Sequence, residues 1–451
     1  MAILMLVILI AFLIIAYFFG KRDLVSPLFL LCLILLVSFL IVLSNYSNWE
    51  VQINGYFVLY LSTAIVCFGL GAALVKAFSP KKVRAVNGLN KVPVSEFDIP
   101  KKYPAWLLLF ISLVLGSIYI YKLLSDAGTA ASFSEKLRKI YDSIVHDDYS
   151  PGFIFNQMRE IVTAIAYVGT YRLLIRIYKG RKDRTSAIAL GLTILMLFAV
   201  ALVTSDRNIF LRYAIFFVCL YVIFFYQNNK GKNCNFKIVA RVVVIALIAF
   251  IIFFLFGKLK QYSSNINRVI GIYGGSGLYN FNLWIEDFDG PLTYGSSTFA
   301  TFLNSVKSIF GSFGFDIEGI EIADRFDKFI TFSSSNGYVY SSNIYSALKP
   351  FVQDFGYFGV ILFPFITGCF YQWLYLKMKN SNYGFAWLAY SMLIYPVIFY
   401  PIADQLFGRF NLGFVYEIVW LSIFYYLIFG MRKKYSKQYS SVGINKVADG
   451  K

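Results

Sequence analysis

The first twenty residues, MAILMLVILIAFLIIAYFFG (Met1–Gly20), carry no charged side chain and are followed directly by Lys21 and Arg22. A secretory signal peptide has the opposite order, with positive charge before its apolar stretch. This stretch is also long enough to cross a bilayer, which takes about 20 mostly apolar residues. We therefore expect a retained first transmembrane helix with an external N-terminus.

The rest of the chain has the same character. It has 451 residues, of which 58% are hydrophobic and 15% are charged, whereas about a quarter of a soluble protein is charged. The net charge of +18 is spread over short basic clusters between apolar runs. That distribution is typical of cytoplasmic loops lying beside anionic lipid, and it does not predict a nucleic-acid partner.

Apolar stretches of spanning length recur along the whole sequence. We count eleven, near 2–19, 27–44, 56–78, 105–124, 158–178, 186–204, 209–226, 238–256, 356–376, 383–400 and 412–430. The predicted fold is therefore an all-α polytopic membrane protein with about eleven transmembrane helices.

Lysine and arginine indicate which loops are cytoplasmic. The clusters in alternate loops are Lys21 and Arg22; Lys81, Lys82, Arg84, Lys91, Lys101 and Lys102; Arg176, Lys179, Arg181, Lys182 and Arg184; Lys230, Lys232 and Lys237; Lys377 and Lys379; and Arg432, Lys433, Lys434 and Lys437. The short opposite loops, 45–55 and 205–208, contain no lysine. The positive-inside rule then predicts an external N-terminus and a cytoplasmic C-terminus.

This topology divides the chain into four parts. Eight transmembrane helices (1–256) precede a large external loop (257–355), which is followed by three more helices (356–430) and a basic cytoplasmic tail (431–451). A loop of that length exceeds what a connection requires, and long loops held by a rigid scaffold often carry function.

Two segments of the large loop have recognisable patterns. The glycines between Gly271 and Gly277 fit neither a dinucleotide-binding nor a Walker spacing, so a flexible turn is expected. Between Phe299 and Phe313, apolar residues recur at steps of three and four, which predicts an amphipathic helix. That helix would lie on the outer membrane surface or pack on the transmembrane bundle.

Cations at the outer ends of the predicted spans run against the positive-inside trend. Ionisable groups at such positions are costly and therefore functional candidates, although a single one is explained by snorkelling. Arginine suits a phosphate because its planar fork donates two parallel hydrogen bonds. A cluster from separate spans thus predicts an anionic ligand. Its candidate members are Arg207, Arg212 and Arg409, joined by Arg159, Lys258, Lys260, Arg268 and Lys349.

Catalytic histidine chemistry is nearly excluded, because His146 is the only histidine. A Ser-His-Asp triad or a multi-histidine metal site would need more. We expect neither a metal nor a cofactor. Of the acids near the outer surface, Asp354 and Asp404 are candidate general bases. Alternatively, Asp354 caps the ninth helix, where negative charge is favourable.

The layout and several motifs resemble the Wzy-type repeat-unit polymerases. These motifs are the short turn with Asp206 and Arg207 before an apolar helix, the large late external loop, and Asn343-x-Tyr345 followed by QDFGYFG (353–359) at the start of the next span. Members of that family make O-antigen, capsule or related surface polysaccharides in the bacterial inner membrane.

The resemblance implies a nucleotide-sugar-independent glycosyltransferase. Its substrate would be an oligosaccharide linked to undecaprenyl diphosphate, and a co-polymerase that regulates chain length would be a partner. Arg207, with Arg212 or Arg409, would neutralise the departing diphosphate, while Asp354 or Asp404 accepts the proton of the acceptor hydroxyl. Asn343, Tyr345 and Trp284 would hold sugar.

Two other functions remain open from the sequence. A flippase or transporter of the same lipid-linked oligosaccharide would show interrupted helices and repeated halves, and we expect neither here. A ligase that transfers lipid-linked glycan to a different acceptor would use similar chemistry.

Overall fold

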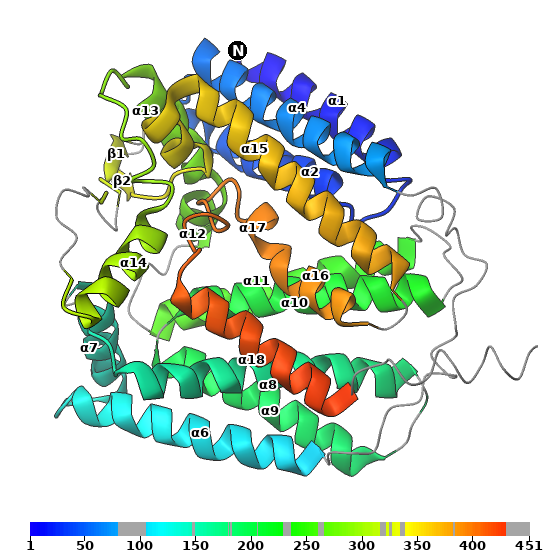
Figure 1. Ribbon diagram of the computed structural model, residues 1–451. Coiled ribbons are helices and arrows are strands. Elements are labelled where there is room, and N and C mark those ends of the chain that lie inside the picture. Colours follow the sequence, from blue (N-terminus) through cyan, green and yellow to red (C-terminus); the bar gives the residue numbers. More distant parts are fainter. Residues whose placement is uncertain are drawn as a thin grey trace, which may run out of the picture. The chain divides into compact units, whose positions relative to one another are not determined.

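The computed structural model (Figure 1) describes most of the chain. The described residues are 1–79, 105–146, 149–178, 180, 183–204, 206–228, 236–259, 266–315, 322–323, 327–333, 339–381 and 384–429. The basic tail (431–451) and Lys260 lie outside them, as does the side chain of Lys258.

The structure confirms the all-α polytopic class. Among the described residues, ten helices are long and apolar enough to span a membrane: α1 (Ala2–Phe19), α2 (Pro27–Ser44), α4 (Gly55–Phe78), α6 (Ala105–Asp126), α8 (Phe153–Tyr178), α9 (Arg184–Val203), α10 (Arg207–Asn228), α11 (Phe236–Leu259, spanning from Lys237), α15 (Leu348–Asn380) and α18 (Leu412–Phe429). The protein is therefore a multi-pass membrane protein. The remaining predicted span is a shorter apolar segment made of α16 (Phe385–Leu393) and α17 (Tyr395–Ile398).

The chain forms two compact units that do not follow the sequence order. Unit 1 comprises 1–91, 130–138 and 205–415, and unit 2 comprises 92–129, 139–204 and 416–451. Most of the residues predicted to form the functional site belong to unit 1.

Glycines allow α4 and α15 of unit 1 to pack backbone against backbone. A Cβ atom on Gly368 would lie 2.1 Å from the carbonyl oxygen of Phe68, and one on Gly71 would lie 2.2 Å from that of Phe365. Small residues at helix interfaces permit this close approach in membranes, where helix association depends on packing rather than on the hydrophobic effect. Both glycines are thus required by the packing of these helices.

Helix α15 is interrupted, contrary to the expectation of unbroken spans. Gly356 has φ 58° and ψ −144°, which divides the helix into a short first part and a long second part. This backbone conformation is accessible to glycine but strained for other residues. The interruption lies in the QDFGYFG motif, two residues after Asp354.

The glycine-rich stretch of the large loop is helical and partly buried, so the prediction of a flexible turn was wrong. It forms α12 (Ile266–Ile270), a π-helical turn η2 (Gly271–Gly275) and α13 (Ser276–Glu286). The Ser38 hydroxyl donates to the carbonyl of Gly274 at 2.6 Å. The glycines allow Trp49 and Ile41 to approach closely, which explains their concentration here.

Buried amide side chains hold α13 in place. Asn282 is fully buried; it accepts from the backbone N–H of Asn54 at 3.0 Å and donates to the carbonyl of Gln52 at 2.8 Å. Asn280, also fully buried, donates to the carbonyls of Ser342 and Ile344 at 3.1 and 2.8 Å. A polar side chain is stable in the interior when it is hydrogen-bonded in this way.

The predicted amphipathic helix is present as α14 (Ala300–Ser312). At its start, the ring of Phe299 lies 6.1 Å from Phe407 and 5.9 Å from Phe363, whereas Phe310 and Phe313 beyond are exposed. It therefore packs on unit 1 at one end and leaves apolar surface uncovered at the other. A two-stranded antiparallel hairpin follows, made of β1 (Ile330–Ser333) and β2 (Val339–Ser342).

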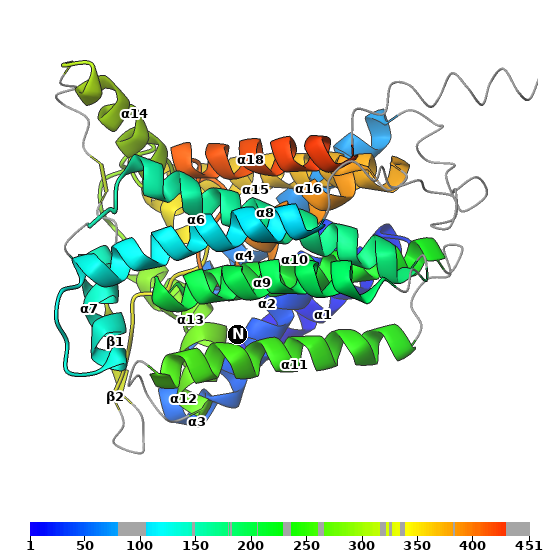
Figure 2. The same ribbon diagram turned by 90° about the horizontal axis from the view of Figure 1, so that it is seen from below.

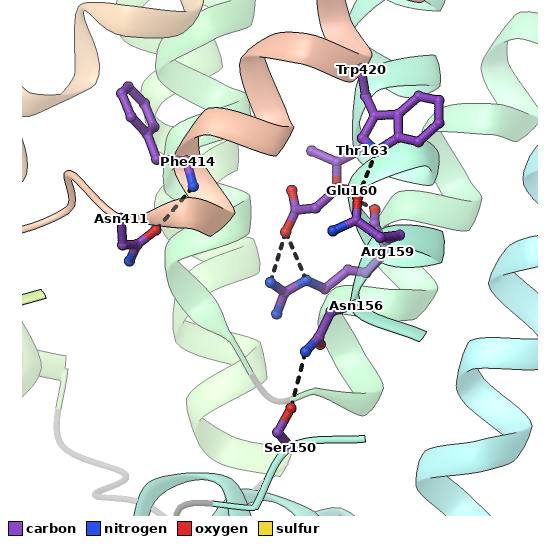
Figure 3. Close-up of polar contacts among 9 residues, drawn as sticks. Ser150, Asn156, Arg159, Glu160, Thr163, Asn411, Phe414 and Trp420 are labelled. Atoms are coloured by element: carbon purple, nitrogen blue, oxygen red, sulfur yellow. Dashed lines mark hydrogen bonds and ion pairs between the residues drawn. The ribbon is translucent and has the colours of Figure 1, made fainter. Parts of the chain in front are cut away.

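Unit 2 contains α6, α8, α9, most of α18 and the second part of α7 (Phe133–His146). Helices α6, α8 and α9 lie side by side in both views of the molecule (Figures 1 and 2). The indole of Trp420 donates to Gln157 at 2.8 Å, which joins α18 to α8 within this unit (Figure 3).

Candidate anion-binding site

The first turn of α10 presents Arg207. Its guanidinium carbon lies 5.6 Å from the ring centroid of Phe253 and 6.0 Å from that of Tyr273. The preceding Asp206 caps the helix by accepting from the backbone N–H of Asn208 at 2.9 Å, which explains why α10 begins there. A helix N-terminus with an adjacent arginine is a favourable environment for an anion.

Two further arginines from different parts of unit 1 meet at one tyrosine. Arg409 donates to the hydroxyl of Tyr395 at 2.8 Å, and its guanidinium carbon lies 5.5 Å from the ring centroid. The guanidinium carbon of Arg212, on α10, lies 5.7 Å from the same centroid. The two charges are consequently no more than about 11 Å apart. The electron-rich ring partly offsets their repulsion.

The segment between α17 and α18 is folded so that Arg409 reaches Tyr395. The carboxylate of Asp404 accepts from three successive backbone N–H groups, those of Leu406 at 3.0 Å, Phe407 at 3.2 Å and Gly408 at 2.7 Å. These bonds close a tight turn immediately before Arg409. The turn is therefore held by interactions other than those of the arginine itself.

An aromatic cluster anchors the same turn. The ring of Phe407 lies 5.1 Å from Phe363 and 5.8 Å from Phe351. The hydroxyl of Thr301, on α14, donates to the carbonyl of Gly408 at 2.9 Å. The large loop and α15 thus jointly hold the turn before Arg409.

The environment of Asp404 alters its acidity. Burial raises the pKa of its carboxyl from 3.8 to about 6, against the opposing effect of the three backbone N–H groups. Asp404 as a whole residue is only partly buried. A pKa near 6 allows the carboxylate to exchange a proton near neutral pH, as a general base must.

Two buried tyrosines next to these groups have hydroxyls with spare hydrogen-bonding capacity. Tyr371 is fully buried and Tyr400 is 5% exposed, and neither hydroxyl has a hydrogen-bond partner among the described residues. Asp404 interacts electrostatically with both, and Tyr395 interacts with Tyr371. Since a buried donor without a partner is costly, a buried water molecule beside either hydroxyl would be favourable.

The other candidate base, Asp354, is in a structural position. It is fully buried, and its carboxylate accepts from the backbone N–H of Ser297 at 3.1 Å and of Thr298 at 2.6 Å. The hydroxyl of Thr293 forms a further short bond to it. These donors come from the loop before α14, so Asp354 holds that loop against α15 instead of capping its own helix.

Lys349 is part of a compact group of side chains. It forms an ion pair with Asp327, and its ammonium lies 3.8 Å from the ring centroid of Tyr345. Tyr345 is 4% exposed and its hydroxyl donates to the carbonyl of Lys328 at 3.0 Å. Burial, together with Asp327, raises the pKa of Tyr345 to about 12. This geometry favours a structural role for both residues.

The remaining predicted residues lie elsewhere. Arg268 donates to the carbonyl of Val339 at 3.5 Å, and Asn343 lies partly exposed after β2. Trp284 lines a separate cavity. Arg159 belongs to unit 2, where it donates to Glu160 at 2.7 and 3.2 Å (Figure 3).

Sequence reasoning did not identify the aromatic partners of the arginines. Tyr395 and Phe253 lie in apolar runs, where an aromatic side chain is an ordinary core residue, and Tyr273 lies in the glycine-rich stretch. No family model, no curated protein and no solved structure matches the chain.

Proposed function

We propose that the protein is a polymerase that joins undecaprenyl-diphosphate-linked oligosaccharide units into a surface polysaccharide at the external face of a bacterial plasma membrane. The observation that carries this proposal is the convergence of Arg212 and Arg409 on Tyr395. Two guanidinium groups within about 11 Å of each other, beside one tyrosine ring, suit an anion with more than one charge. A lipid diphosphate is such an anion and has an anchor in the membrane.

The proposed reaction is a glycosyl transfer. The acceptor hydroxyl forms a bond to the anomeric carbon of the growing glycan, and the bond from that carbon to the diphosphate breaks. Arg212 and Arg409 stabilise the charge that develops on the leaving diphosphate. Asp404 takes the proton of the hydroxyl, since its pKa of about 6 leaves it mostly ionised at neutral pH.

The role of Asp404 predicts an acid limb in the pH dependence. The single-turnover rate should fall about tenfold per pH unit below pH 6, because protonated Asp404 cannot act as a base. Asp404→Asn should be slow at every pH. A wild-type rate that stays constant from pH 7 to pH 5 would exclude Asp404 as the base.

Unfolding of the protein on protonation of Asp404 does not explain the expected fall in rate below pH 6. The pKa of Asp404 in the folded protein, about 6, exceeds the ordinary carboxyl value of 3.8. Its protonation therefore favours the folded state, and the stability that it contributes is lost as the pH rises through 6, not as it falls. Thermal unfolding measured at pH 5 and pH 7 separates the two effects.

One observation favours a flippase as the second candidate. The interruption of α15 at Gly356 and the division of the tenth apolar segment between α16 and α17 resemble the discontinuous helices of transporters. Non-helical backbone at membrane depth also occurs wherever it is buried in protein or lines a water-filled cavity, so these breaks are compatible with the polymerase as well.

Incubation of the purified protein in proteoliposomes with a lipid-linked oligosaccharide tests these functions. A ladder of products that differ by one repeat unit is the expected result. Unchanged substrate that crosses the bilayer would instead identify a flippase, and transfer to an acceptor that is not a repeat unit would identify a ligase.

A further inference from the structure

A cavity of about 580 Å³, open to solvent, lies at the end of α13, and its lining combines aromatic rings with carboxylates. Pockets for small molecules commonly have volumes of roughly 300–1,000 Å³. Trp284, Phe288 and Ile330 supply apolar surface, and Asp287 and Asp289 supply the acidic groups. The cavity thus has the size and the mixed lining of a ligand site.

The aromatic wall is rigidly built. The ring centroids of Trp284 and Phe288 lie 4.4 Å apart with an interplanar angle of 33°. The ring centroid of Phe281, three residues before Trp284, lies 6.1 Å from that of Trp284. Lys349, whose charge is matched by Asp327, lies 5.6 Å from the Trp284 ring. A fixed aromatic surface binds a flat apolar face with little loss of conformational entropy.

The acidic groups are available to a ligand. Asp287 and Asp289 are exposed, and among the described residues no ion pair engages either carboxylate. Ionised carboxylates only accept hydrogen bonds, so the ligand must supply hydroxyl or ammonium donors. The two negative charges also repel an anionic ligand.

We infer that this cavity binds one sugar of the glycan and selects an amino-bearing sugar over an acidic one. The inference takes its ligand class from the proposed function. The apolar face of the sugar ring packs against the aromatic side of the cavity, formed by Trp284 and Phe288, while Asp287 and Asp289 accept from its ammonium and hydroxyl groups. None of the residues that line the cavity is among those that contact Tyr395, and we assign the cavity to recognition of the glycan.

Binding of soluble trisaccharides to the detergent-purified full-length protein tests the inference. Titration calorimetry should give the tightest binding for chitosan trisaccharide, weaker binding for neutral cellotriose and none for trigalacturonate. The double variant with Asp287→Asn and Asp289→Asn should bind chitosan trisaccharide at least fivefold more weakly than the wild type. Trp284→Ala should bind both chitosan trisaccharide and cellotriose more weakly.

Matched controls distinguish the site from general charge and aromatic effects. Glu286→Gln removes an adjacent exposed carboxylate that does not line the cavity, and Trp106→Ala removes an exposed indole from α6; both should bind like the wild type. Equal binding of trigalacturonate, or unchanged affinity in the double variant, would overturn the inference. The inference would also be overturned if choline bound as tightly as chitosan trisaccharide and cellotriose did not bind.

The two proposals fail in different ways. If chitosan trisaccharide binds as expected but no product ladder forms from lipid-linked units, the polymerase proposal fails and the sugar site remains. If the ladder forms with the same KM in Trp284→Ala as in the wild type, the sugar site fails and the polymerase remains.

Discussion

Replacing Arg409 by alanine is expected to reduce the rate of polymerisation by at least about 100-fold, the usual effect of removing one group that stabilises developing charge. Arg409 donates to Tyr395 at 2.8 Å and lies beside the same ring as Arg212. Its loss leaves the departing diphosphate with half of the proposed clamp. The rate is measured as the appearance of the first joined product in a single turnover, with the protein in excess over the lipid-linked substrate.

Two variants serve as controls for this prediction. Arg409→Lys keeps the charge but loses the planar fork, so it should recover only part of the rate. Arg241, on α11, also donates to a tyrosine hydroxyl, that of Tyr221, at 3.0 Å, and Arg241→Ala should retain the wild-type rate. Equal losses in Arg409→Ala and Arg241→Ala would show that the effect is not specific to the Tyr395 site.

The second large effect is expected on stability. Gly368→Ala should destabilise the protein by about 2 kcal/mol, within the range found for overpacked interiors. Its Cβ would lie 2.1 Å from the carbonyl oxygen of Phe68, a backbone atom that cannot move aside without separating α4 from α15. The midpoint of thermal unfolding in detergent, followed by scanning fluorimetry, should fall.

Gly191→Ala is the matched control for this substitution. Gly191 lies inside α9, and a Cβ there meets no atom within 4 Å. Because alanine is the better helix former, this variant should keep or slightly raise the unfolding midpoint. An unchanged midpoint in Gly368→Ala would mean that the two helices are not packed as closely as described here.

Hydropathy alone predicted the helical class and most of the spans. For example, the predicted span 56–78 corresponds to α4 (Gly55–Phe78). It did not predict the breaks. The span predicted at 383–400 divides into α16 and α17 near Pro396, which lacks the N–H that a continuous helix requires, and α15 is interrupted at Gly356.

The composition of the site was predictable in part, whereas its arrangement was not. The unfavourable placement of cations at outer span ends identified Arg212 and Arg409 as candidates. Their meeting at Tyr395 depends on tertiary contacts between segments almost 200 residues apart. The sequence also could not separate Asp354 from Asp404, because only the structure shows that Asp354 is fully buried and holds the loop before α14.

The most direct test is a cryo-EM structure of the protein with bound undecaprenyl diphosphate. The account predicts density for the diphosphate within hydrogen-bonding distance of the guanidinium groups of both Arg212 and Arg409, beside the ring of Tyr395. Diphosphate density that lies away from both arginines would contradict it.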